Sequence, residues 1–173
     1  MNKTRNITYN ITFAFNCLLV FLILFGKALS IPTWLQVMGR MHPLLLHFPI
    51  VLLITAIVWE GFLSKKIENT EGVAKSEIGD WILLSAALTA AISAVMGLFL
   101  SQEEGYNAEA IAWHKWTGVA VSLVTITWFS LRNKVRENKG LSLIASAISL
   151  VAIILAGHQG ANITHGEDRK SVV

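Results

Sequence analysis

Five long apolar runs divide the chain, and short polar segments separate them. The runs lie at roughly 9–29, 43–63, 81–101, 110–131 and 141–160. Each has about 20 residues, the length that a helix needs to cross the hydrocarbon core of a bilayer. Because lipid offers the backbone no hydrogen-bond partner, such runs must be helical. The pattern therefore predicts an all-α integral membrane protein.

The last four runs are predicted to form one transmembrane domain over residues 42–160. Small residues recur at four-residue spacing in the third run, at Ala86, Ala90 and Ala94, and such residues let helices approach closely in lipid. The short connections favour antiparallel neighbours. The expected fold is an up-down four-helix bundle with an extra N-terminal signal or anchor helix. Residues 31–41 are expected to form an interfacial helix, and residues 161–173 an outer tail.

The N-terminal segment 1–30 allows two interpretations. Lys3 and Arg5 precede the first apolar run, and Ala28-Leu29-Ser30 has small residues at the spacing of a signal-peptidase site. The segment is therefore either a cleaved signal peptide or a retained anchor. The length of the run favours retention, because the apolar part of a signal peptide has about 7–15 residues. Both interpretations place residue 31 outside the cytoplasm.

Composition and charge agree with a membrane protein. Hydrophobic residues make up 54% of the chain and charged residues 14%, which is too few for a soluble domain. The formal net charge is +3, and the basic residues lie in short clusters between the apolar runs. We therefore expect the lipid bilayer, and no nucleic acid, as a partner.

The distribution of basic residues predicts the orientation. With the N-terminus in the cytoplasm, the inner segments hold nine lysines and arginines and the outer segments five. The loop 132–140 holds four of them, whereas the loop 102–109 holds three glutamates and no basic residue. Basic residues accumulate on the cytoplasmic side. The prediction is a multi-pass protein of the cell inner membrane, with a cytoplasmic N-terminus and a periplasmic C-terminus.

Several kinds of site are excluded by residue usage. Cys17 is the only cysteine, which excludes an internal disulfide, a cysteine-ligated zinc, an iron–sulfur cluster and a c-type haem. The chain has no phosphate-binding glycine loop, no nucleophile elbow and no H-E-x-x-H pattern. Any metal must therefore use histidine and oxygen ligands.

All five histidines fall at the outer end of this topology. They are His42, His47, His114, His158 and His165. Bundle interiors are where cofactor sites are built from facing side chains. Together with Arg40, which is placed to pair with a haem propionate or a lipid phosphate, the five histidines are the candidate cofactor-binding residues.

The positions of the histidines along the helices indicate which of them lie closest to the core. His47, His114 and His158 belong to three different helices, each within about one to one and a half turns of the outer boundary. Five residues rotate a helical side chain by about 140°, so only one of His42 and His47 can face the core. We expect this to be His47, with His158 as its partner from the neighbouring helix and His114 as the alternative to either.

Four interpretations fit these histidines. They are interfacial polar residues without a cofactor, the two axial ligands of a b-type haem, or zinc or copper ligands in the set His47, His114 and His158. The fourth is a proton relay or quinol chemistry without a metal. Two acidic residues are given structural roles only: Asp80 as a helix N-cap, and Glu60 as a side chain that reaches water.

Three motifs resemble a bacterial four-helix membrane domain of unknown function. They are Gly39-Arg40-Met41-His42-Pro43-Leu44-Leu45-Leu46-His47-Phe48-Pro49-Ile50, then Glu104-Gly105-Tyr106 with Trp113-His114-Lys115-Trp116-Thr117-Gly118, and finally Gly157-His158-Gln159-Gly160 with Thr164-His165-Gly166. They cover about residues 39–166. The resemblance implies a context of redox partners, because similar domains are fused to cytochrome c or Rieske modules on the outer side.

Two functions follow as hypotheses. The first is a redox-linked module that carries haem b, or accepts quinol electrons, and passes them to an outer cytochrome c or Rieske protein. The second is a non-enzymatic membrane scaffold that docks an outer partner protein through residues 102–116 and 161–173. A homo-oligomer is the other partner considered. Since the sequence stops at Val173 without a redox module, the partner is expected to be a separate protein or the chain a shortened family member.

Overall fold

The computed structural model describes residues 3–26, 29, 31–63, 72–102 and 108–165. Helices account for nearly all of this part of the chain, which contains no strand. The helices are α1 (Lys3–Phe25), α2 (Thr33–Gly39), α3 (His42–Leu45), α4 (His47–Val58), the π-helix η2 (Trp59–Leu63), α6 (Gly72–Leu100), α7 (Ala108–Glu137) and α8 (Lys139–His165). The prediction of an all-α protein is confirmed.

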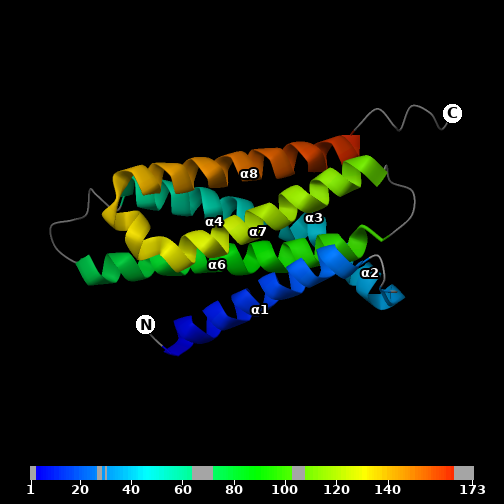
Figure 1. Ribbon diagram of the computed structural model, residues 1–173, viewed down its shortest axis with the longest axis horizontal. Helices are drawn as coiled ribbons and strands as arrows, with labels where there is room; N and C mark the ends of the chain where they lie inside the picture. The colour runs from blue at the N-terminus through cyan, green and yellow to red at the C-terminus, as the bar shows by residue number, and fades with distance from the viewer. Residues whose placement is uncertain (1–2, 27–28, 30, 64–71, 103–107, 166–173) are drawn as a thin grey trace.

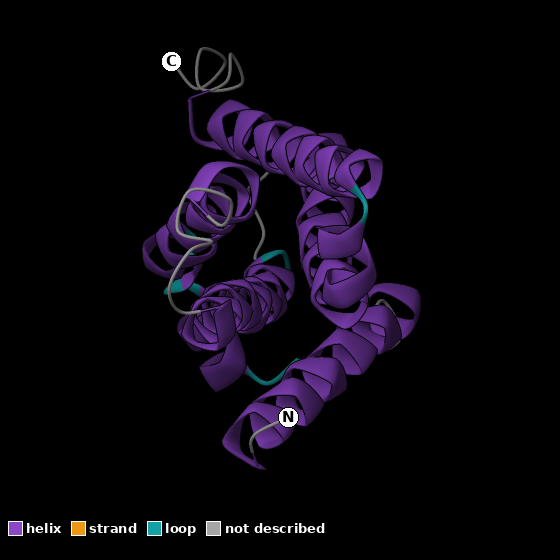
Figure 2. Ribbon diagram, turned by 90° about the vertical axis from the view of Figure 1, so that its left-hand side faces the viewer, coloured by secondary structure: helices purple, strands orange, loops and turns teal. Residues whose placement is uncertain are grey.

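The long helices run side by side (Figure 1). α7 packs on both α6 and α8, α4 packs on α6, and α1 packs on the far side of α6. Figure 2 shows the same helices nearly end-on, with α1 and α8 at opposite edges of the molecule. α6 is therefore the central helix, and its two sides carry different neighbours.

Four helical segments are long and apolar enough to cross a membrane. They are Lys3–Phe25, Thr33–Gly61, Glu77–Leu100 and Lys139–Ile163. Four of the five predicted runs thus have the length and composition of membrane spans. The fifth, 110–131, is not among these segments, because His114 and Lys115 near one end and Arg132 at the other shorten the apolar stretch of α7.

The second predicted run is broken at its outer end. α3 has Pro43 in its first turn, and α4 begins at His47 with Pro49 buried in its own first turn. The predicted interfacial helix is α2. It lies directly against α6, because a Cβ added at Gly39 would lie 2.7 Å from the backbone nitrogen of Leu100. This close contact fixes the short segment that leads into His42.

A cluster of charged side chains joins the helices about 20 Å along α6 from Ser93. It consists of Arg5, Glu60, Asp80, Arg132 and Arg136, and we call it the charge cluster. Asp80 is 5% exposed; its carboxylate lies 2.9 Å from Arg5, 3.0 Å from Arg132 and 2.7 Å from Arg136. Arg136 also donates to both carboxylate oxygens of Glu60. The cluster thereby ties together α1, η2, α6 and α7.

The charge cluster corrects two of the structural roles expected from the sequence. Asp80 is not an N-cap, because α6 begins eight residues earlier, at Gly72. Glu60 does not reach water; it is 7% exposed and lies in the π-helix, which turns it toward Arg136. Desolvation lowers the pKa of Arg136, but the hydrogen bonds and charges of Glu60 and Asp80 outweigh it, so the net pKa shift is upward.

Candidate functional site

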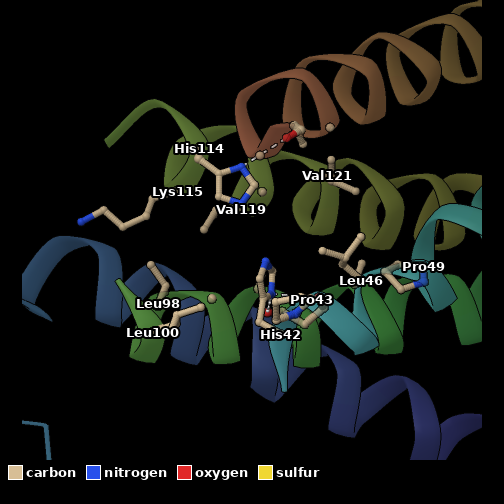
Figure 3. A pocket seen from close by; sticks show the side chains of 18 of the residues that line it. His42, Pro43, Leu46, Pro49, Leu98, Leu100, His114, Lys115, Val119 and Val121 are labelled. Carbon is tan, nitrogen blue, oxygen red and sulfur yellow. Dashed lines mark hydrogen bonds between the residues drawn. The ribbon is translucent and has the colours of Figure 1, made fainter. Parts of the chain in front are cut away.

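A largely apolar cavity of about 370 Å³ lies between α3, α4, α6, α7 and α8 (Figure 3). Small residues line much of it, among them Ala90, Ala94, Gly97, Gly118, Ala156, Gly157 and Gly160. The polar residues of the lining are His42, Ser93, Ser101, His114 and Lys115. Because small side chains leave space and polar groups are few, the cavity suits an apolar ligand held at defined points.

His42 and His114 face each other across this cavity. Their ring centroids lie 5.9 Å apart, and their ring planes meet at 73°. His42 comes from α3 and His114 from α7, and both are half-buried. In Figure 3 one nitrogen of each ring points toward the other ring. The structure therefore brings together two histidines that are 72 positions apart in the sequence.

The second nitrogen of each ring is held by a backbone carbonyl of another helix. Nδ1 of His42 lies 2.8 Å from the carbonyl oxygen of Ser93, and Nδ1 of His114 lies 3.2 Å from that of Ala156. A carbonyl oxygen can only accept, so each Nδ1 carries the proton and donates it. In the neutral imidazole this leaves Nε2 with a free lone pair. Both histidines thus present a lone pair to the cavity.

A glycine makes room for each imidazole. Gly97 follows Ser93 by four residues on α6, and Gly160 follows Ala156 by four residues on α8. A Cβ added at Gly97 would lie 3.1 Å from Cε1 of His42, and one at Gly160 would lie 3.2 Å from Cε1 of His114. A helical carbonyl already accepts from the N–H four residues later, so a glycine there uncovers the carbonyl for a second donor. The same arrangement therefore occurs on two helices. We call it a cradle: the carbonyl of Ser93 with Gly97 on α6, and the carbonyl of Ala156 with Gly160 on α8.

The other predicted site residues lie elsewhere. His47 and His158 are exposed and do not line the cavity. Nδ1 of His47 lies 3.4 Å from the Leu44 carbonyl oxygen, and Nε2 of His158 lies 3.4 Å from the amide nitrogen of Asn162. Arg40 is exposed just after α2. The side chain of His165 lies outside the described residues.

The set His47, His114 and His158 is therefore not assembled. In the described part of the chain, no group of three or more histidine, cysteine, aspartate or glutamate side chains could hold a metal ion. The expectation placed His47, rather than His42, on the side of the helix that faces the core. The structure has the opposite arrangement: His42 lies against α6, and His47, five residues later, is exposed. Cofactor binding by any of these residues stays a prediction.

Sequence reasoning missed the residues of the two cradles. The spacing of Ser93 with Gly97 and of Ala156 with Gly160 is visible in the sequence. Small residues at four-residue spacing usually indicate close helix packing, so this spacing alone does not point to a site. The signal that would have found these residues is a pattern that occurs on two helices. In each helix a small residue precedes a glycine by four positions, and a histidine from another helix, His42 or His114, needs a hydrogen-bond partner.

The chain belongs to the family of predicted membrane proteins (DUF2231), whose model matches residues 40–167. This region includes both facing histidines and their cradles, and it begins after α1. No curated protein and no solved structure matches the chain. The resemblance to a membrane domain of unknown function is confirmed, whereas its association with cytochrome c or Rieske modules stays a prediction.

Proposed function

We propose that this chain is a redox-linked membrane module that binds one b-type haem between His42 and His114. The observation that supports the proposal is the pair of imidazole rings that face each other across the cavity, each with its Nδ1 against a helix carbonyl, which leaves Nε2 available as a ligand. An electron-pair acceptor between the rings would engage both Nε2 atoms. The helix carbonyls that accept from Nδ1 act as the outer partners that metal-bound histidines commonly have.

The separation of the two rings fits a single metal atom. A histidine nitrogen binds a metal at about 2 Å, so two imidazoles on opposite sides of one metal have ring centroids about 6 Å apart. The observed separation is 5.9 Å. A quinol fits this gap less well, because hydrogen bonds of about 2.8 Å from its two opposite hydroxyls to the two Nε2 atoms would hold the ring centroids roughly 13 Å apart.

The cavity favours haem over a bare ion. Structural zinc sites have four protein ligands, and catalytic sites three, whereas haem iron needs only axial ligands from the protein. Two facing histidines can supply both axial positions. The cavity of about 370 Å³ is far larger than an ion requires, and its apolar walls suit a porphyrin. Lys115, which lines the cavity, provides a cation for a propionate carboxylate.

The proposal includes a topology and a partner. We place α7 across the membrane beside α6 and α8, with its less apolar residues shielded by these two helices. The four basic residues of the loop 132–140 then lie in the cytoplasm, and the haem lies near the periplasmic face. Haem in that position can exchange electrons with a periplasmic cytochrome c or Rieske protein.

The colour of the purified full-length protein tests the proposal. After expression with added haem precursor, we expect a Soret band that shifts on reduction by dithionite. Metal analysis should give one iron per chain, with zinc and copper at background. A colourless protein, even after haem is added to the purified chain, would contradict the proposal and favour the scaffold hypothesis.

The cradles supply a second test. Gly97→Ala and Gly160→Ala should each push an imidazole out of place, because the added Cβ would lie 3.1 or 3.2 Å from the ring. Overpacking of this kind costs about 1–3 kcal/mol, so haem affinity should fall about tenfold. The measurement is the dissociation constant from a haem titration. Gly61→Ala is the matched control, since a Cβ there meets nothing within 4 Å and Gly61 does not line the cavity; equal losses in all three variants would contradict the cradle model.

A further inference from the structure

We infer that α1 stays in the mature protein as an integral helix, and that the Ala28-Leu29-Ser30 motif is not a used cleavage site. The inference is independent of haem binding. It rests on how α1 packs against α6 and α7, beyond the region that defines the family. The sequence left a cleaved signal peptide and a retained anchor as alternatives.

Polar contacts hold α1 at three levels. Arg5 pairs with Asp80 of α6 at 2.9 Å. The hydroxyls of Tyr9 and Ser130 lie 3.2 Å apart. Further along, the Ser122 hydroxyl of α7 donates to Oδ1 of Asn16 at 2.9 Å, and both of these side chains are buried.

The contact residues of α1 form one stripe. They are Arg5, Tyr9, Thr12, Asn16 and Leu19, at alternating spacings of four and three residues. This is the spacing of a helix seam that packs against another helix. Leu19 is 0% exposed and belongs to a core cluster with Ala91, Val95, Leu98 and Val119. The opposite side of α1 is apolar and exposed, as at Leu18 and Phe21, which suits lipid.

A cleaved leader has no need of such a stripe. A signal peptide requires only a basic start, an apolar run and a cleavage motif. An asparagine within an apolar membrane segment is costly unless it is partnered, and Asn16 has its partner on α7. Removal of α1 would leave Ser122 without this bond and would uncover the core cluster around Ala91. Retention of α1 therefore accounts for the stripe, and cleavage does not.

The intact mass of the full-length chain tests the inference. The protein is purified from membranes through a C-terminal tag, and its mass and N-terminal sequence are determined. We expect a chain that still contains α1. An N-terminus at Leu29, Ser30 or Ile31 would overturn the inference, whatever the result of the haem experiments.

A pair of variants tests the packing itself. Leu19→Ala removes a fully buried side chain, whereas Leu18→Ala, on the next residue, removes one that is 39% exposed. We expect the Tm of the detergent-solubilised protein to fall by about 5 °C or more for Leu19→Ala and to change little for Leu18→Ala. Equal Tm values for the two variants would show that α1 does not pack as inferred.

Discussion

His42→Ala and His114→Ala are each expected to lose most of the haem bound by the purified protein. Each substitution removes one of the two imidazoles that face each other across the cavity, where the ring centroids are 5.9 Å apart. A haem would then keep one of its two protein ligands to iron, and most of the remaining cavity lining is apolar. The measurement is the Soret absorbance per chain after identical expression and haem supplementation.

His47→Ala and His158→Ala are the matched controls. Both histidines are exposed, and neither lines the cavity, so these variants should keep full haem occupancy. Free imidazole should restore binding to His114→Gly, because the small ligand can occupy the space left by the ring. Loss of haem in the two control variants, with full occupancy in His42→Ala and His114→Ala, would reverse the assignment in favour of His47 and His158.

Asp80→Ala is expected to destabilise the folded protein by about 3–5 kcal/mol, the usual cost of removing one partner from a buried ion pair. Asp80 is 5% exposed and is shared by Arg5, Arg132 and Arg136. When the Asp80 carboxylate is removed, three guanidinium groups remain close together, and Glu60 is the one carboxylate left in the charge cluster. The measurement is the Tm in detergent, which should fall by about 10 °C.

The control for this prediction lies on the same helix. Glu77 precedes Asp80 by three residues and is exposed, so Glu77→Gln should leave the Tm within about 1 °C of the wild type. An Asp80→Ala variant as stable as Glu77→Gln would show that the charge cluster does not hold α1, η2, α6 and α7 together.

The helices could be predicted well because the constraint that forms them is local. A bilayer forces each apolar run into a helix whatever its neighbours are, so most of each run near 9–29, 81–101 and 141–160 belongs to α1, α6 and α8 respectively. The interfacial segment 31–41 likewise contains α2. Among the long helices that the structure describes, α7 does not meet the hydropathy criterion for a membrane span. Two of its polar residues, His114 and Lys115, line the cavity, and a hydropathy average cannot distinguish such residues from exposed ones.

The site could be predicted only in part, because it depends on contacts between helices. The sequence analysis selected His47 and His158 and gave His114 only as an alternative, whereas the structure places His42 and His114 at the cavity. Which of these two rings meets α6 depends on how this part of the chain is rotated about its helix axis against α6. A local pattern does not determine that rotation.

The charge cluster shows the same limit. Asp80 resembles an N-cap and Glu60 a boundary residue when each is considered with its neighbours in sequence. Their partner Arg136 lies 56 positions from Asp80 and 76 from Glu60. Only the packing of α6, α7 and η2 shows that these side chains are buried and paired.

The ligation of a single iron by both His42 and His114 is measured most directly by low-temperature EPR of the oxidised full-length protein. Two axial imidazoles should give a low-spin ferric haem signal that accounts for one iron per chain. In His42→Ala and His114→Ala this signal should be lost, or replaced by a high-spin signal from residual haem. A wild-type protein whose haem is high-spin, or a low-spin signal that both variants retain unchanged, would contradict a haem bound between these two histidines.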